Sequence, residues 1–510
     1  MEPLPQLKPD TRENRALLDN VRPSDWVNPA PAPCYNLVVI GAGAAGLVCA
    51  AGAARLGARV ALVEHHLLGG DCLNYGCVPS KGVIRAARAI HEARQGGQFG
   101  IAGTAGLAVD FDRAMERMRE IRAEISPHDS ARRYRDELGV DVFFGTGRFT
   151  APDSAEVAGA KLCFRKAAIC TGARAAAPPI PGIEEAGYLT NETVFSLTRL
   201  PGRLDVIGGG PIGCELAQTF ARFGSRVTLV EHMGQILSRE DADAAEIVRE
   251  SMLRDGVEIC LSAKVVKASM SGHERIVIIE RNGDRSELAV DEILVGVGRA
   301  PNLEGLGLEA AGIRYDPRLG VMVDEQLRTS NRRVFAAGDI CSPFKFTHTA
   351  DAQARILIAN ALFMGRRKTS ALTIPWCTYT DPEVAHVGLY EQEARQKGVD
   401  VTTLTVPLSD VDRALLDGEV EGFARVHLKK GNDTILGATI VARHAGEMIN
   451  ELSLAMTAGL GLTAIGNTIH PYPTQAEGVK KLADAYNRTR LTPFVKKVLS
   501  AWLTWQRKRP

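Results

Sequence analysis

Two segments of the chain share one pattern of apolar and polar positions. Residues 38–64 read VVIGAGAAGLVCAAGAARLGARVALVE and residues 205–231 read DVIGGGPIGCELAQTFARFGSRVTLVE, with a constant offset of 167. Each begins with a short apolar run, passes through a glycine-rich turn and an apolar-rich stretch of helical length, and ends in a second apolar run that closes on Glu. The pattern predicts strand, turn, helix and strand in each copy. We therefore predict an α/β fold with two Rossmann-like dinucleotide-binding domains.

The glycines of both copies follow the spacing G-x-G-x-x-G. In this motif the first glycine allows a tight turn, the second lets the backbone approach a pyrophosphate, and the third lets the helix pack against the strand. The Glu that ends each copy can accept hydrogen bonds from ribose hydroxyls. The residues are Gly41, Gly43, Gly46 and Glu64 in the first copy, and Gly208, Gly210, Gly213 and Glu231 in the second. Two matched copies indicate two sites, one for FAD and one for a nicotinamide dinucleotide that exchanges hydride with it.

Glu231 also bears on which nicotinamide dinucleotide binds. It is followed by His232 and Met233, with no arginine in the next few positions. A carboxylate here favours an unphosphorylated ribose and repels a 2′-phosphate, so NADH is favoured over NADPH. Arg226 and Arg239 lie near enough in the sequence to keep NADPH as an alternative.

A pair of cysteines follows the first copy, in the segment GGDCLNYGCVPSK at residues 69–81. Cys72 and Cys77 are five positions apart, a rise of about 7.5 Å on an ideal helix, whereas a disulfide needs Cα atoms about 5.5–6 Å apart. A bridge therefore needs an irregular turn, which Gly76 and Pro79 can provide. The alternatives are a metal site, for which no second ligand pair is evident, and two inert buried thiols. The dinucleotide motif directly upstream favours a redox-active disulfide.

With these motifs the chain resembles the class I pyridine nucleotide-disulfide oxidoreductases, which include dihydrolipoyl dehydrogenase, glutathione reductase and mercuric reductase. The segment GGDCLNYGCVPSK is similar to the active-site signature of this family, and the resemblance extends from about residue 35 to 485. Residues 296–302, 334–339 and 375–383 are similar to further family segments. The resemblance implies FAD in the first site, the nicotinamide dinucleotide in the second, and a two-fold dimer.

The resemblance also implies roles for individual residues. Cys77 would be the thiolate nearer the flavin, and Cys72 the interchange thiol that meets the acceptor. A helix that starts near Pro79 would aim its N-terminus at the two sulfurs, and Lys81 would lie by the flavin and pair with Glu215. No structural metal is expected, although the two cysteines can hold an acceptor metal ion transiently. Beyond the residues of the two copies, those implied for cofactor binding are Gly70, Lys81, Gly147, Thr171, Gly172, Gly298 and Asp339.

The C-terminal segment departs from the disulfide reductases of this family, which carry His-Pro-Thr and a Glu five positions after the His. This chain has HPYPTQAE at residues 470–477. Aligned on Pro473, Thr474 and Glu477, Tyr472 takes the position of the base. A phenol with a pKa of about 10 accepts a proton poorly at neutral pH, whereas a soft metal ion held by thiolates needs electrons rather than protons. Tyrosine at this position resembles the mercuric reductases.

Three hypotheses for function follow. The favoured one is a homodimeric, mercuric reductase-like FAD enzyme that passes electrons from NAD(P)H through the cysteine pair to an acceptor such as Hg(II). This chain lacks the C-terminal cysteine pair that is usual in mercuric reductases, because its last cysteine is Cys377. The second is a dihydrolipoamide or small-molecule disulfide oxidoreductase in which His470 or water replaces the usual base. The third is a flavin-bound redox sensor or a membrane-recruited binding module.

The repeat and the resemblance together predict the domain organisation. We expect an N-terminal extension at residues 1–34, an FAD domain at 35–180 and 300–369, an NAD(P) domain at 181–299, an α+β dimerisation domain at 370–485 and a basic amphipathic tail at 486–510. In the dimerisation domain, residues 435–441 predict a strand and 446–458 a helix. In the family arrangement Tyr472 and Glu477 act on the flavin site of the other subunit.

Composition narrows the possible partners and location. The 510 residues carry 61 Lys and Arg against 60 Asp and Glu, and 5% are aromatic, which argues against a nucleic-acid binder. Ten cysteines are too sparse for a secreted disulfide scaffold. The N-terminus is polar and rich in proline, without the apolar core of a signal peptide, so we expect a cytoplasmic protein.

The tail is the one strongly biased segment. From Tyr486 onward it has seven basic residues and no acidic one. Its apolar residues fall near one helical face, and they are Phe494, Val495, Val498, Leu499, Trp502 and Trp505. We favour a helix docked on the dimer surface, with a membrane-surface helix as the alternative.

Overall fold

The structure is a computed structural model that describes residues 6–104, 106–176 and 178–508. The chain forms two compact units, Met1–Gly234 with Asp255–Leu372, and Gln235–Arg254 with Thr373–Pro510. Parallel sheets with intervening helices make up much of the first unit, and an antiparallel sheet lies in the second, which confirms the predicted fold class. Among the described helices, none is both long enough and apolar enough to span a bilayer.

The first sheet is built around β1 (Tyr35–Ile40), which runs parallel to both of its neighbours. Its order is β3-β2-β1-β6-β5-β4, and β18 pairs with β6. In the register, Leu37 lies opposite Val60 and Tyr35 opposite Phe164. The other strands are β2 (Val60–Glu64), β3 (Asp141–Phe144), β4 (Arg148–Ala151), β5 (Ser154–Val157), β6 (Ala160–Ile169) and β18 (Val334–Ala336).

Both faces of this sheet are covered, so β1 and β2 read as nearly continuous apolar runs rather than as alternating ones. Leu37 and Leu62 pack into a core with helices α2 (Ala44–Arg55) and α10 (Thr347–Leu362). Val38 and Val63 point into a second core on the other face, together with residues of β4, β5 and the segment 306–321.

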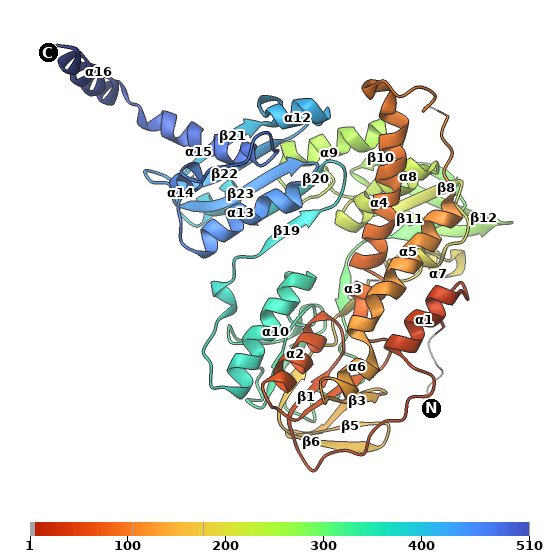
Figure 1. Ribbon diagram of the computed structural model, residues 1–510. Helices are drawn as coiled ribbons and strands as arrows, with labels where there is room; N and C mark the ends of the chain where they lie inside the picture. The colour runs from red at the N-terminus through yellow and green to blue at the C-terminus, as the bar shows by residue number, and fades with distance from the viewer. Residues whose placement is uncertain (1–5, 105, 177, 509–510) are drawn as a thin grey trace. The chain divides into compact units, whose positions relative to one another are not determined.

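Three helices lie side by side in the first unit: α1 (Arg12–Val21), α4 (Cys77–Arg94) and α5 (Phe111–Ile125) (Figure 1). Helix α1 belongs to the predicted N-terminal extension, which packs against the first sheet. The Arg22 guanidinium donates to the carbonyl of His65 at 3.2 Å and lies 4.4 Å from the centroid of the Phe144 ring. The described part of the extension is therefore an ordered part of this unit.

The second parallel sheet has the order β10-β9-β8-β14. Its strands are β8 (Arg203–Ile207), β9 (Arg226–Glu231), β10 (Val257–Leu261) and β14 (Glu292–Val295). Helix α8 (Pro211–Phe223) packs on β9 and against α4. An antiparallel sheet follows, with β11 (Ala263–Ser271), β12 (Glu274–Arg281) and β13 (Asp284–Val290).

Short elements connect these layers in the first unit. The helices are α3 (Gly70–Asn74), α6 (Ala131–Asp136) and α7 (Ile183–Ala186), and the strands are β7 (Ala173–Ala175), β15 (Arg299–Pro301), β16 (Tyr315–Asp316) and β17 (Gly320–Val321). Across the chain, 3₁₀ turns lie at η1 (Gln95–Phe99), η2 (Ser126–Asp129), η3 (Val194–Ser196), η4 (Thr369–Ala371) and η5 (Leu408–Asp410).

The second unit contains an antiparallel sheet of order β19-β20-β23-β22-β21. Strand β23 (Ile435–Ala442) and helix α13 (Ala445–Thr457) agree within one residue at each end with the strand and the helix predicted at residues 435–441 and 446–458. The other strands are β19 (Pro375–Thr378), β20 (Glu383–Gly388), β21 (Val401–Pro407) and β22 (Phe423–Lys429). The other helices are α9 (Ala242–Arg254), α11 (Glu391–Gln396), α12 (Asp412–Asp417), α14 (Leu462–Gly466), α15 (Glu477–Arg490) and α16 (Pro493–Arg507).

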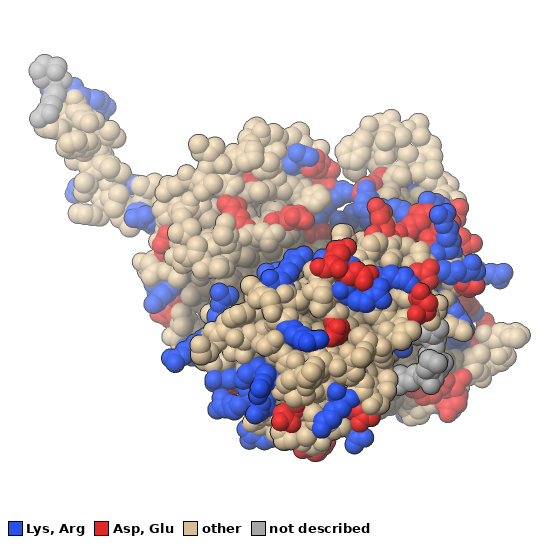
Figure 2. All heavy atoms as spheres, turned by 60° about the horizontal axis from the view of Figure 1, so that its bottom comes forward, with Lys and Arg blue, Asp and Glu red and all other residues tan. Residues whose placement is uncertain are grey.

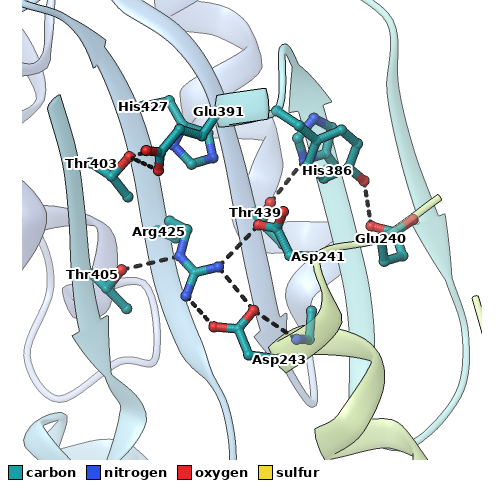
Figure 3. A network of polar contacts seen from close by, with 12 residues as sticks. Glu240, Asp241, Asp243, His386, Glu391, Thr403, Thr405, Arg425, His427 and Thr439 are labelled. Carbon is teal, nitrogen blue, oxygen red and sulfur yellow. Dashed lines mark hydrogen bonds and ion pairs between the residues drawn. The ribbon is translucent and has the colours of Figure 1, made fainter. Parts of the chain in front are cut away.

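A polar network holds α9 and the residues before it in the second unit (Figure 3). Nη1 of Arg425, on β22, lies 3.0 Å from a carboxylate oxygen of Asp241, and the same guanidinium contacts Asp243. Nearby, the buried Glu240 carboxylate accepts hydrogen bonds from Nε1 of Trp376 at 2.8 Å and from the hydroxyl of Tyr390 at 2.6 Å. These side chains tie a segment that leaves β9 to the antiparallel sheet.

Over much of the face that Figure 2 shows, Lys and Arg are interspersed with Asp and Glu. Helix α16 differs, since its basic residues have no acidic neighbours within the helix. None of its residues is buried within the described chain. The predicted docking of this helix on the dimer surface and the alternative contact with a membrane both stay predictions, and Arg509 and Pro510 lie outside the described residues.

Candidate active site

The two glycine turns have the same backbone arrangement. The N–H of Gly41 donates to the carbonyl of Val63 at 2.8 Å, and that of Gly208 to the carbonyl of Val230 at 2.9 Å. Both glycines have positive φ, +100° and +109°, a conformation that other residues rarely adopt. The sequence offset of 167 is thus reproduced as a repeated structure.

The third glycine of each motif allows the helix to lie close to the turn. A Cβ on Gly46 would lie 1.8 Å from the carbonyl oxygen of Gly41, and one on Gly213 would lie 1.9 Å from that of Gly208. Helices α2 and α8 therefore start directly beside the strand ends. Neither helix has a side-chain cap among the described residues, so their N-terminal N–H groups form the donor set that a pyrophosphate needs.

The acidic residue at the end of each copy is oriented by backbone N–H groups. The Glu64 carboxylate accepts from the N–H groups of Ala42 and His66, both at 2.7 Å. Burial raises the pKa of Glu64, but hydrogen bonds from His65 and from these two N–H groups outweigh it and lower the pKa. The carboxylate therefore stays ionised and keeps lone pairs for ribose hydroxyls.

Glu231 repeats this arrangement in the second copy. Its carboxylate accepts from the N–H of Gly209 at 2.6 Å and from that of Met233 at 2.7 Å. Nδ1 of His232 lies 2.7 Å from the same carboxylate. The donors and acceptors at both turns fit the two dinucleotides that the sequence predicts.

The cysteine pair lies at a break between two helices. Cys72 belongs to the short helix α3, and Cys77 is the first residue of α4, which begins two residues before the expected Pro79. Gly76 separates the two helices with φ −119° and ψ −110°, so the irregular turn that a bridge requires is present. The positive end of α4 thereby falls on Cys77 itself.

A close backbone contact sets the cysteine segment against the first dinucleotide turn. Gly70 has φ +56°, and a Cβ on it would lie 2.5 Å from the Cα of Gly43. Any side chain at position 70 would push the segment away from the turn. Because Cys72 is two residues further on, this contact brings the thiols close to the predicted FAD site.

The two cysteines are free thiols in this structure, and they differ in acidity. A hydrogen bond between them raises the pKa of Cys72 and lowers that of Cys77. The hydroxyl of Thr347, at the start of α10, lies 3.4 Å from Sγ of Cys77, and this contact and the charge of Lys81 lower the pKa of Cys77 further. The surroundings of the pair therefore favour a thiolate at Cys77 over one at Cys72.

Lys81 and Glu215 are brought together by the packing of α4 on α8. The ammonium group of Lys81 lies 2.8 Å from a carboxylate oxygen of Glu215, whose side chain is 6% exposed. The ion pair connects the cysteine helix to the second dinucleotide-binding copy.

Several residues near the cysteines were not identified from the sequence. The Asp71 carboxylate accepts from Nη1 of Arg299 at 3.1 Å and from Nδ2 of Asn191 at 3.0 Å. Nε of Arg299 also lies 3.6 Å from a carboxylate oxygen of Asp339. Asn191 and Arg299 are more than one hundred residues from Asp71 in the sequence, so no local sequence pattern predicts these contacts. Together with Thr347, they surround the pair with polar groups.

The remaining residues expected to bind cofactor lie at strand ends and turns of the first unit. A Cβ on Gly147 would meet Val63 at 2.9 Å, so this turn lies directly on the end of β2. The hydroxyl of Thr171 donates to the carbonyl of Asn302 at 2.9 Å, and the carbonyl of Gly172 accepts from the N–H of Asn302 at 3.0 Å. Gly298 has φ +130°, and burial raises the pKa of Asp339.

Tyr472 and Glu477 lie in the second unit. The Tyr472 hydroxyl donates to a carboxylate oxygen of Asp412 at 2.9 Å, and this hydrogen bond raises the pKa of the phenol. One carboxylate oxygen of Glu477 lies 3.4 Å from the ammonium of Lys481. The other is buried and has no hydrogen-bond partner within the described chain.

His470 has an acidic partner that the sequence did not reveal. Its Nε2 lies 2.9 Å from a carboxylate oxygen of Glu451 on α13, and Nδ1 lies 3.0 Å from the carbonyl of Thr468. With one ring nitrogen held by a carboxylate and the other by a carbonyl oxygen, the orientation of the His470 ring is fixed.

Comparisons with known proteins agree with this architecture. Residues 35–354 match the family described as pyridine nucleotide-disulphide oxidoreductase, and residues 374–483 match its dimerisation domain, which indicates a homodimer. A mercuric reductase of Staphylococcus aureus is 35% identical over 457 residues, which cover 89% of this chain and 83% of the relative. A dihydrolipoyl dehydrogenase of Thermus scotoductus is 35% identical over 468 residues, which cover 89% and 98%.

Among solved structures, the HOCl-induced flavoprotein disulfide reductase RclA from Escherichia coli is similar, with a TM-score of 0.79 and 31% identity. The match covers 88% of this chain and 99% of that one. Members of the matched family depend on FAD and use NAD(P)H. With its paired glycine turns and cysteine pair, the chain belongs to the class I pyridine nucleotide-disulfide oxidoreductases.

Proposed function

We propose that the protein is an NAD(P)H-dependent reductase in which Cys72 and Cys77 carry two electrons from bound FAD to an acceptor. The observation that carries this proposal is the placement of Cys77 at the start of α4, with the Thr347 hydroxyl 3.4 Å from its Sγ, a setting in which the pKa of Cys77 is lowered and that of Cys72 is raised. A stabilised thiolate at Cys77 leaves Cys72 as the thiol that exchanges with the acceptor. FAD, when bound, supplies hydride acceptance from the nicotinamide and electron transfer to the sulfurs.

Glu231 supports NADH as the favoured reductant. Its carboxylate is held by two backbone N–H groups and lies where the ribose 2′-oxygen of a bound dinucleotide would be recognised. A 2′-phosphate would bring negative charge against it. A Glu231→Ala variant is therefore expected to lose more activity with NADH than with NADPH.

A thiolate-bound metal ion, such as Hg(II), is the favoured acceptor. Tyr472 supports this choice, because its hydrogen bond to Asp412 makes the phenol a still weaker acid and leaves it poorly suited to proton transfer at neutral pH. A relative of this chain, RclA, has also been solved as a Cu(II) complex. Reduction of Hg(II) to Hg(0) at the thiols consumes two electrons, which the cysteine pair can supply.

The contact of His470 with the Glu451 carboxylate favours a second candidate, a small organic disulfide such as lipoamide. Reduction of a disulfide requires a proton for the leaving thiol, and a histidine oriented by a carboxylate can deliver it. The dihydrolipoyl dehydrogenase relative is as similar in sequence as the mercuric reductases. The cytoplasm stays the predicted location for either activity.

Anaerobic turnover with NADH separates these candidates. We expect Hg(II), supplied as a dithiol complex, to be reduced faster than lipoamide or oxidised glutathione. Faster turnover with lipoamide than with Hg(II) would overturn the metal acceptor and favour the disulfide. Cys260→Ser serves as the control variant because Cys260 is a partly exposed cysteine on β10, outside the segment that holds the pair. If Cys72→Ser turned over normally with every acceptor, the proposed function would fail.

A further inference from the structure

Two cysteines outside the proposed active site lie in direct contact. Sγ of Cys34 is 2.9 Å from Sγ of Cys163, although the two residues are 129 positions apart. Both are free and partly exposed. Neither Cys34 nor Cys163 is one of the candidate active-site residues, so the active site does not explain their contact.

The sheet register explains why the two sulfurs meet. Tyr35 at the start of β1 lies opposite Phe164 on the parallel strand β6, and the two cysteines each precede these residues by one position. Because side chains alternate along a strand, Cys34 and Cys163 lie on the opposite face from the buried rings of Tyr35 and Phe164. Adjacent strands are about 4.8 Å apart, within the range of Cα separations that disulfides tolerate.

We propose that Cys34 and Cys163 form a second, reversible disulfide, which joins the end of the N-terminal extension to the first sheet under oxidising conditions. The sulfurs must approach by about 0.9 Å to reach the bond length of a disulfide. Rotation of the two side chains accomplishes this without a change of register. The partial exposure of both sulfurs gives a peroxide access to the thiols, and a thiol reductant access to the bond.

The oxidation balances with a hydroperoxide as the named oxidant. Hydrogen peroxide takes two electrons from one thiol, which becomes a sulfenic acid as the O–O bond breaks and one water leaves. The second thiol then attacks the sulfenic sulfur, the S–S bond forms, and the sulfenic oxygen leaves as a second water. Reduction by two equivalents of a small thiol, through a mixed disulfide, restores both cysteines.

The bond would close a loop that contains the first glycine turn, α2 and the Cys72–Cys77 segment. A cross-link over a long loop restricts the unfolded chain more than the folded one. The oxidised protein should therefore unfold and release its flavin at a higher temperature than the reduced protein. This effect is separate from turnover at the active site.

Peptide mapping of the flavin-loaded protein tests the proposal. The holoenzyme is treated with hydrogen peroxide, the remaining thiols are blocked with N-ethylmaleimide, and the digest is analysed by mass spectrometry with and without a reductant. We expect a linked peptide pair that contains Cys34 and Cys163 and disappears on reduction. Recovery of both as blocked thiols, as sulfinic acids, or as links to other cysteines would overturn the proposal.

Variants and a redox buffer give a second readout. In a series of buffers with different ratios of reduced to oxidised glutathione, the wild-type protein is expected to lose the thiols of Cys34 and Cys163 in one step. No glutathione should stay attached to either residue. Stable glutathione adducts on Cys34 or Cys163 would contradict a bridge. After oxidation, the wild type and the matched control Cys260→Ser should unfold at a temperature several degrees higher than Cys34→Ser or Cys163→Ser. The rate of NADH oxidation should be unchanged in all of these variants.

Discussion

The ammonium group of Lys81 lies 2.8 Å from a carboxylate oxygen of Glu215, and this ion pair connects helix α4 to helix α8. Lys81 is on the helix that begins with Cys77, and Glu215 is on the helix that follows the second glycine turn. The cation that lowers the pKa of the Cys77 thiol is therefore held by a carboxylate of the second glycine-turn copy.

Loss of this cation should make the Cys77 thiol less acidic. Since the charge of Lys81 lowers the pKa of Cys77, we expect Lys81→Met to shift the thiolate titration of the reduced enzyme to higher pH. The ultraviolet absorbance of the thiolate, followed against pH, measures the shift. Lys81→Met also removes an ion-pair partner of the buried Glu215 carboxylate, which is expected to lower the stability of the fold. The double variant with Glu215→Gln should recover stability but not the thiolate pKa, and an unchanged titration in both would argue against the role of Lys81.

The two sulfurs should differ in their optical signature. Two-electron reduction of the flavin-loaded enzyme is expected to give a long-wavelength absorbance from a thiolate beside oxidised flavin. The absorbance should vanish in Cys77→Ser and survive in Cys72→Ser, because Cys77 has the lowered pKa. Anaerobic titration with NADH gives the measurement. A band that persists in Cys77→Ser would mean that the two sulfurs have been assigned in the wrong order.

The groups near the C-terminus should separate the two candidate acceptors. His470→Asn removes the ring that Glu451 orients, so lipoamide turnover is expected to fall by about 10²-fold, the scale of general acid–base catalysis. Hg(II) reduction should change little in the same variant. Steady-state rates with both acceptors give the comparison, and Glu451→Gln should show a weaker form of the same effect. Equal losses with both acceptors would point to a structural role for the histidine.

Asp205 is expected to make stability depend on pH. It is fully buried on β8, neither carboxylate oxygen has a partner within the described chain, and burial raises its pKa from 3.8 to about 7. The folded state holds the Asp205 proton more tightly than the unfolded state does. The contribution of this group to stability is therefore fully present below about pH 4 and is lost as the pH rises to about 7. Above that pH the cost of the ionised form reaches up to about 4 kcal/mol.

Thermal unfolding between pH 5 and 8 measures this dependence. In Asp205→Asn the group no longer titrates, so the decline of the midpoint with rising pH should flatten. Glu258→Gln, an exposed change on the neighbouring part of the same sheet, is the control and should leave the slope as in the wild type. An unaltered slope in Asp205→Asn would show that this carboxyl does not set the pH response.

Removal of residues 491–510 should weaken the dimer. The apolar face of α16 is exposed within the chain, with Phe494 75% and Trp502 53% exposed, and we expect a second copy to cover it. Analytical ultracentrifugation of the full chain and of the truncated chain measures the dissociation constant. If the truncated chain had the same dissociation constant as the full chain but no longer floated with vesicles of anionic lipid, the membrane-surface alternative would be favoured instead.

The local parts of the fold could be predicted because short-range patterns determine them. The repeat of residues 38–64 and 205–231 gave both glycine turns, since G-x-G-x-x-G permits one backbone path between a strand and a helix. The strand at 435–441 and the helix at 446–458 matched the structure within one residue at each end. Helix α4 starts near Pro79 as predicted, at Cys77, so that Pro79 lies in its first turn.

The site partners could be predicted only where a family resemblance supplied them. Lys81 and Glu215 are 134 residues apart, and their spacing carries no signal of contact. Thr347 beside Cys77, Arg299 beside Asp71 and Glu451 beside His470 were all missed for the same reason. In each case the two residues belong to different elements that only packing brings together.

By itself the sequence determined the α/β class, two dinucleotide turns and a cysteine pair at a helix break, because each depends on residues within about thirty positions of one another. Tertiary structure alone decided which groups lower the pKa of Cys77, which carboxylate orients His470, and that Cys34 lies against Cys163. The physical reason is that charge, hydrogen bonding and burial act over a few ångströms in space, and sheet register and helix packing bring distant residues within that range.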